Sequence, residues 1–198
     1  MKDLDIIPEC YIDTNLVETL LNIKGCCTEG VNHQKGCNTV VKTMTNSRKL
    51  QDDFALGIVD ADKRQPSYVA KECTPIAQTA HITLLKHRTN NHYFYFLRIA
   101  PAMDTLILSC AKEAGINMEE YELTYDLKTF TKITKEVESK NDPRFKKLFK
   151  QIKGTAEMTA LGNVLEYLRG HKYDAEEDEL KKLLNISSSD IDNRQPLK

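Results

Sequence analysis

Apolar and polar residues in the first 115 positions form short runs that predict strands and helices in alternation. Residues 54–59 are an apolar run bounded by polar residues, which predicts a buried strand. Residues 92–99 give the strongest strand signal, residues 80–86 give another, and residues 9–13 predict a short first strand. Amphipathic spacing predicts helices between the strands, for example over residues 102–114. The alternation favours an α/β fold with a mostly parallel sheet flanked by helices.

The pattern changes at residue 117, where strand signals stop and apolar residues recur at helical spacing. The helices predicted for this region cover residues 125–135, 142–153, 155–169 and 175–184. The last residues of the chain are polar and lack the apolar positions that a packed core requires. We therefore expect an α/β core at residues 1–116, a helical extension packed on that core at 117–186 and a disordered tail at 187–198.

Acidic residues follow the predicted strands. Asp13 ends the first strand, and Asp60 and Asp62 directly follow the central one. Asp104 lies in the first turn of the helix after the strand at residues 92–99. Because the carboxyl ends of parallel strands lie at one edge of a sheet, we expect these acids to meet there. The simpler alternatives are an acidic, solvated turn and, for Asp104, a favourable contact with the helix dipole.

Carboxylates that gather in this way repel one another unless a cation lies between them. Hard oxygen ligands at an open site suit Mg²⁺ or Mn²⁺, and two such ions can stabilise the attacking and leaving oxygens of a phosphodiester. A zinc site is disfavoured, because the six cysteines form no C-x-x-C pair and the five histidines show no tight ligand spacing. The acids therefore predict a divalent metal site bound by oxygen ligands.

A glycine and several cations indicate where a phosphate would bind. Gly36 lies at a predicted turn from strand to helix, where the backbone can approach an anion beside a helix N-terminus. Lys35, Lys63 and Arg64 are the cations that we expect to contact the phosphate. The alternatives are a tight turn without a ligand and, for Lys63 and Arg64, local counter-charges to the acids beside them. A basic run within residues 144–153 is either a footprint for nucleic acid or a solvated helix face.

Composition sets the remaining bounds. The chain has 28 basic and 29 acidic residues, so its net charge does not indicate a nucleic-acid partner. No apolar run approaches a membrane span, and the first residues lack the basic and apolar regions of a signal peptide. Cysteines without a disulfide-like or zinc-like spacing are typical of reduced thiols, so we expect a cytoplasmic protein with no membrane contact.

The order of these features resembles a TOPRIM domain, the catalytic fold of topoisomerases, primases and recombination proteins. The resemblance covers residues 9–115 and is carried mainly by Asp60-Ala-Asp62 after an apolar strand, with a glycine after the second strand and an acid three residues after Pro101. The most similar variant is that of the overcoming-lysogenization-defect nucleases and small prokaryotic relatives in phage-defence systems. The resemblance thus implies a TOPRIM-like sheet and a nuclease-type metal site.

The resemblance also implies a role for each acid. Asp60 and Asp62 would bind metal, and Asp104 would replace the acid that follows the later strand of the family. Asp13 would take the place of the strand-end glutamate, the proposed general acid or base. The family has Glu where this chain has Asp13 and Asp104, so both carboxylates are one methylene shorter here. Glu9 and Glu18 are the other acids close to the first strand.

Three functions fit these features. The first is a Mg²⁺- or Mn²⁺-dependent nuclease that cleaves DNA or RNA, with a role in phage defence implied by the resemblance. The second is a catalytically weak or inactive TOPRIM-like module that acts through a protein partner such as an ATPase, since this chain has no phosphate-binding Gly-x-x-x-x-Gly-Lys-Ser/Thr loop of its own. The third uses the Asp-x-Asp pair as in nucleotide-sugar transferases or aspartyl-phosphate phosphatases.

Overall fold

The computed structural model describes residues 2–26, 29–46, 53–61, 66–89 and 93–185. The five-stranded sheet has the order β2-β4-β7-β6-β5, and a separate two-stranded sheet pairs β1 with β3. The strands are β1 (Lys2–Asp3), β2 (Ile6–Pro8), β3 (Gly30–Val31), β4 (Phe54–Asp60), β5 (Cys73–Gln78), β6 (Ile82–His87) and β7 (Tyr93–Ile99). The α-helices are α1 (Tyr11–Leu20), α2 (Cys37–Met44), α3 (Ser67–Glu72), α4 (Met103–Glu113), α5 (Leu127–Thr134), α6 (Pro143–Ile152), α7 (Ala156–His171) and α8 (Glu177–Leu184). Short 3₁₀ helices are η1 (Met118–Tyr121), η2 (Val137–Lys140) and η3 (Lys172–Asp174).

The fold is α/β as predicted, but the sheet is mixed and the prediction of a mostly parallel sheet is wrong. β2 and β7 each pair with β4 in parallel, whereas β6 pairs with both β7 and β5 in antiparallel fashion. The reason is the length of the connections. Parallel neighbours need a crossover of a dozen or more residues, whereas only residues 79–81 join β5 to β6 and residues 88–92 join β6 to β7. Such short connections form hairpins.

The first strand also differs from its prediction. Residues 9–13 do not form a strand, because β2 ends at Pro8 and α1 begins at Tyr11. The pairing of β2 with β4 sets these bounds. Ile7 lies opposite Gly57, and the Glu9 N–H continues the pairing by donating to the Ile58 carbonyl at 3.1 Å. Asp13 therefore lies in the first turn of α1, and Glu9 is the acid that follows the strand.

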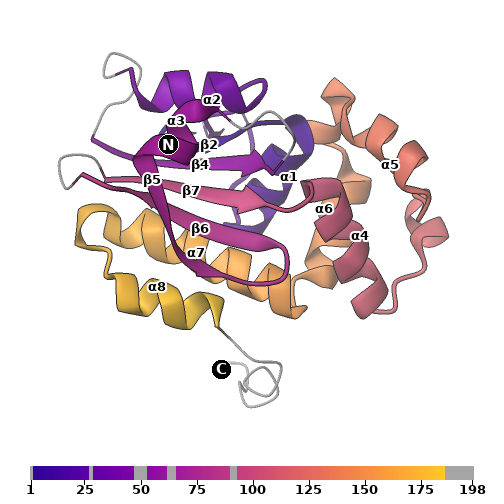
Figure 1. The fold of residues 1–198 in the computed structure, drawn as a ribbon. Coiled ribbons are helices and arrows are strands. Elements are labelled where there is room, and N and C mark those ends of the chain that lie inside the picture. The colour runs from indigo at the N-terminus through magenta and orange to yellow at the C-terminus, as the bar shows by residue number, and fades with distance from the viewer. Residues whose placement is uncertain (1, 27–28, 47–52, 62–65, 90–92, 186–198) are drawn as a thin grey trace.

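Helices cover both faces of the sheet, with α2 and α3 on one face and α7 and α8 on the other (Figure 1). The alternation of β4 makes this possible. Phe54, Leu56 and Ile58 belong to the larger core with α1, α4 and α7, while Ala55 and Val59 belong to the smaller core under α2.

Gly57 faces the smaller core, where a Cβ atom would come within 2.8 Å of the Met44 Sδ and of the Phe96 ring. The missing side chain therefore lets α2 approach the sheet.

The helices after residue 117 share the larger core with the sheet. Helix α6 packs on α1, α5 packs on α4, and α8 packs on β5. Their apolar side chains, including Phe130, Phe145, Phe149 and Leu165, are fully buried. Within the described residues, none of the helices has both the length and the apolar character that crossing a membrane requires. The segment predicted as a disordered tail lies outside the described residues.

Candidate functional site

Glu9 and Asp60 meet where the parallel strands β2 and β4 end. The Asp60 backbone N–H donates to the Glu9 Oε2 at 3.2 Å. The Asp60 Oδ1 in turn accepts a hydrogen bond of 2.8 Å from the N–H of Met103, the first residue of α4. A carboxylate at a helix N-terminus is stabilised by the helix dipole. The two acids thus connect β2, β4 and α4 at one edge of the sheet.

Asp13 lies behind these two acids in the first turn of α1 and is fully buried. Neither of its carboxylate oxygens has a hydrogen-bond partner of ordinary geometry, although the Cys10 thiol lies beside it. Burial raises the pKa of Asp13 well above its ordinary value, and the negative charges of Asp60, Glu9 and Asp104 raise it further. The charges of the other three acids therefore reach Asp13, which favours its protonated form.

The Cys10 thiol belongs to the same environment. Its pKa is raised, first by burial and then by the negative charge of Asp13, with a smaller contribution from Asp60. A thiol with a raised pKa is a poor nucleophile and a poor metal ligand at neutral pH. Cys10 therefore serves as a neutral neighbour of Asp13.

The structure brings together three of the four predicted acids and adds Glu9. The charges of Asp60 and Asp104 act on Asp13 near the edge where β2 and β4 end, with Asp104 in the first turn of α4 as expected. Asp62 lies outside the described residues, as do Lys63 and Arg64.

Lys35 and Gly36 lie beside this edge. The Gly36 N–H donates to the Glu9 carbonyl at 2.9 Å, and Gly36 precedes the first turn of α2 with a φ of 80°. This left-handed backbone is one that glycine adopts without strain. The Lys35 side chain is exposed, and its Nζ lies 5.5 Å from the centre of the Tyr11 ring. Both residues are thus in position to meet a ligand that approaches Glu9.

Glu9 is the residue that the sequence pattern leaves without a role. The apolar run Ile6-Ile7-Pro8 immediately before it is the signal that could have identified it as the strand-end acid. Tyr11 and Ile12 have high strand propensity, and that propensity moves the predicted strand to residues 9–13. Pairing of Ile6–Pro8 with β4 overrides it.

The donor set at the edge is made of carboxylate oxygens, which suits Mg²⁺ or Mn²⁺. Among the described residues, no three or more His, Cys, Asp or Glu side chains are arranged so that they could hold a metal ion as they stand. Mg²⁺ is commonly bound through one or two carboxylates, with waters and substrate phosphates completing its shell. The Asp13 carboxyl, buried without a hydrogen-bond partner of ordinary geometry, is the group here that a nearby cation would stabilise most.

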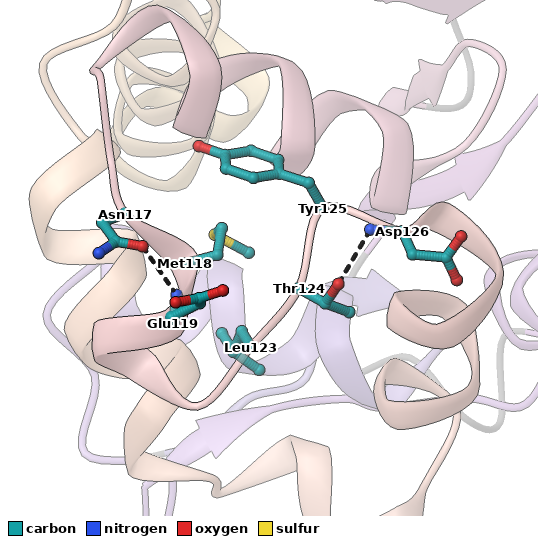
Figure 2. Close-up of a pocket in the computed structure, with 7 residues that line it drawn as sticks. All are labelled: Asn117, Met118, Glu119, Leu123, Thr124, Tyr125 and Asp126. Carbon is teal, nitrogen blue, oxygen red and sulfur yellow. Dashed lines mark hydrogen bonds between the residues drawn. The ribbon is translucent and has the colours of Figure 1, made fainter.

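A separate pocket of about 420 Å³ lies between η1 and the start of α5. Figure 2 shows that its lining includes two local turns, in which Glu119 N–H donates to Asn117 Oδ1 and Asp126 N–H donates to Thr124 Oγ1. None of the four acids lines it. Its polar groups are engaged in holding the connection between helices, so the acid edge remains the better candidate site.

Comparison of the chain with protein-family models, with curated proteins and with solved structures finds no match. The fold family therefore stays a prediction made from the motifs, and the candidate site is defined by the contacts among its own residues.

Proposed function

We propose that this protein is a Mg²⁺- or Mn²⁺-dependent enzyme that cleaves phosphodiester bonds of nucleic acid on a TOPRIM-like core. The single observation that supports the proposal most is the meeting of Glu9, Asp13, Asp60 and Asp104 from three separate segments. Chance can place one acid after a strand. Four that interact at the end of two parallel strands match the place where open α/β sheets bind their ligands.

Each acid has a distinct part in this proposal. Asp60 and Asp104 would hold the metal together with Glu9, and we propose Asp62, two positions after Asp60 in the sequence, as a further ligand. A bound metal would supply stabilisation of the negative charge that develops on phosphate oxygens. Glu9, directly after β2, takes over the part of the strand-end glutamate that the motif pattern assigns to Asp13.

Asp13 then acts from behind the ligands and does not touch the substrate. It is fully buried, and its raised pKa reflects that burial together with the charge of Asp60. A proton on its carboxyl limits the repulsion among the acids when no metal is bound. We infer that Asp13 is a positioning residue that releases this proton when a cation arrives.

Nucleic acid is the proposed substrate because the groups beside the acids suit phosphate. Lys35 is exposed next to the N-terminus of α2, and Gly36 allows close approach of the backbone. The basic helix α6 buries Phe145 and Phe149 while Lys147 and Lys150 are exposed, so its charges are available to a second stretch of the strand.

The test is cleavage of labelled single- and double-stranded DNA and RNA by the purified full chain with Mg²⁺, Mn²⁺ or EDTA. Asp60→Asn keeps an oxygen that can accept from the Met103 N–H and removes the charge, so α4 should keep its start. We expect this variant to lose about 100-fold or more in rate. Asp174→Asn, at an exposed residue of η3, is the matched control and should cleave like the wild type.

Equal cleavage by wild type and Asp60→Asn, or cleavage that continues in EDTA, would contradict the proposal. A wild-type chain that cleaves none of these substrates would instead favour the module that acts through a partner, such as an ATPase. The defence role that the resemblance implies has its own readout. Cells that express the wild type should resist phage infection better than cells that express Asp60→Asn.

A further inference from the structure

A cluster of cationic and aromatic side chains lies beside the acid edge, formed by Tyr11, His33, Lys35 and Lys140. The His33 ring stacks on the Tyr11 ring with centroids 4.4 Å apart and an interplanar angle of 21°. Lys35 lies over the same Tyr11 ring, and the charge of Lys140 acts on His33. The four residues come from the start of α1, the loop after β3 and η2. We call them the Tyr11–Lys140 corner.

The orientation of His33 is fixed by one ring nitrogen. Its Nδ1 lies 3.2 Å from the Cys10 carbonyl and 3.0 Å from the Thr14 Oγ1. Because a carbonyl oxygen can only accept, Nδ1 carries the proton and donates to Cys10. In the neutral ring Nε2 is then the unprotonated nitrogen, and it is buried without a hydrogen-bond partner. The ring is held in place with one polar atom left unused.

Two further contacts hold the cations in place. The buried Asn15 amide donates to the Ser139 carbonyl at 2.7 Å and to the Asp142 carbonyl at 3.3 Å, which fixes η2 and hence Lys140 against α1. The Gln34 N–H donates to the Pro8 carbonyl at 3.0 Å, which holds the loop that carries His33 and Lys35 along the end of β2. The corner is thus built by the fold and does not depend on exposed side chains alone.

The corner gathers positive charge that is only partly balanced. Within the part of the chain that the structure describes, no carboxylate forms an ion pair with Lys35 or Lys140. Burial lowers the pKa of His33, and the charges of Lys140 and then Lys35 lower it further, against the opposing hydrogen bond to Cys10. The acid on which Lys140 acts is the buried Glu18, on the inner side of α1. An anion bound by the two lysines would reduce the repulsion between their charges and a protonated His33.

We propose that the Tyr11–Lys140 corner binds a backbone phosphate of the polynucleotide strand, next to the acids and separate from them. This inference rests on the function proposed above and defines where the strand runs. Lys35 and Lys140 contact the phosphate as charges, and His33 adds its positive charge without direct contact once the buried Nε2 takes up a proton. The site is therefore distinct from a metal site, because two lysines beside it disfavour a cation.

Binding can be measured without cleavage. The probe is a fluorescently labelled single-stranded oligonucleotide, titrated in EDTA against the full chain at several salt concentrations. Lys35→Ala with Lys140→Ala should weaken binding and reduce the slope of log K against log salt by about 0.7, because one phosphate contact of a single strand is removed. Lys132→Ala, at an exposed site of α5, should leave both quantities at their wild-type values.

His33→Asn separates a binding role from a structural one. Asparagine can still donate to the Cys10 carbonyl in place of Nδ1, but it has no counterpart of Nε2. We expect about tenfold weaker binding from a chain that melts like the wild type. In the wild type, the NMR titration of His33 should move to a higher pKa when the oligonucleotide binds, because the phosphate charge stabilises the imidazolium.

Unchanged affinity and salt slope in the lysine double variant, or a His33 titration that the oligonucleotide does not move, would overturn the corner as a phosphate site. The two proposals can fail separately. Cleavage by a chain whose corner variants bind normally refutes the corner alone. Binding that depends on the corner, in a chain that cleaves nothing, supports the corner and refutes the nuclease.

Discussion

Helix α1 buries two acids, and the fold compensates them to different degrees. Glu18, at 1% exposure, accepts a 3.2 Å hydrogen bond from the Val31 N–H at one oxygen and lies within the influence of Lys140 and Lys146, while its Oε2 has no hydrogen-bond partner. Asp13, at 0% exposure, has no hydrogen-bond partner of ordinary geometry and has only acids among the charged groups that act on it. A carboxyl that the fold compensates is structural. A buried carboxyl that the fold leaves uncompensated indicates a place where a ligand could bind.

The surroundings of Glu18 show how much of the chain is arranged for it. A Cβ atom at Gly30 would come within 2.8 Å of the Glu18 Oε1, and one at Gly25 would overlap the Oε2. Both positions are glycine, so the loop from α1 to β3 can close over the carboxyl. Nothing comparable accommodates Asp13, whose neighbours repel its charge. The difference indicates that the Asp13 end of α1 is adapted for function and the Glu18 end for stability.

The largest expected effect comes from filling the space that Glu18 occupies. Gly25→Ala combines a left-handed φ of 65° with overlap of the new methyl group and the Glu18 carboxylate. We expect a loss of about 2–4 kcal/mol in the free energy of unfolding, measured by urea denaturation. Gly115→Ala is the matched control, because Gly115 has the same φ and no other atom lies within 4 Å of the place that its new methyl group would take. It should lose only about 1–2 kcal/mol. Equal losses in both variants would show that Glu18 does not fill this space.

The second effect is a gain in the free energy of unfolding when Asp13 is replaced. A carboxyl with a raised pKa in the folded state contributes stability below its unfolded pKa and loses it as the pH rises through the folded value. Asp13→Asn has no carboxyl at this position and so does not lose this stability as the pH rises. In EDTA, its free energy of unfolding should therefore increasingly exceed that of the wild type from acidic to alkaline pH. We expect the variant to be more stable at pH 8 by about 1–3 kcal/mol, the cost of burying a polar group without a hydrogen-bond partner.

The measurement is urea denaturation of both proteins at a series of pH values, with Asp174→Asn as an exposed control. Added Mn²⁺ should reduce the difference in free energy of unfolding between the variant and the wild type. A cation near the acids stabilises the charged wild-type carboxyl and has less effect on the amide. A variant that is less stable than the wild type at every pH would mean that Asp13 is compensated by its surroundings. The contrast between the two ends of α1 would then disappear.

The sequence predicts the parts of this arrangement that are local. The apolar runs of β4 and β7 are long enough to be recognised, and Asp60 and Asp104 lie at the expected edge. The predicted first strand is misplaced, because Tyr11 and Ile12 suggest a strand until the pairing of Ile7 with Gly57 is known. That pairing is a long-range contact, which periodicity within a short window cannot report.

The contacts around His33 cannot be predicted from the sequence for the same reason. Asn15 and Ser139 are distant in sequence, and only the folded chain shows that the hydrogen bond between them carries Lys140 to the start of α1. Strand β5 escapes prediction because residues 66–78, which contain it, give no clear strand pattern. Pro75 and the irregular register beside it explain that weak signal.

The smallest expected effect tests the compensated acid directly. Glu18→Gln keeps an oxygen that can accept from the Val31 N–H and fits the space left by Gly25 and Gly30, but it removes the charge. Burial raises the pKa of Glu18, and the Val31 hydrogen bond and the charges of Lys140 and Lys146 oppose that rise without cancelling it. We expect the free energy of unfolding to change by less than about 1 kcal/mol at pH 8. Glu18→Gln is measured beside Asp13→Asn under the same conditions. If Glu18→Gln gains as much stability as Asp13→Asn, both ends of α1 bury an uncompensated charge. Burial without a partner would then no longer single out Asp13 as the functional acid.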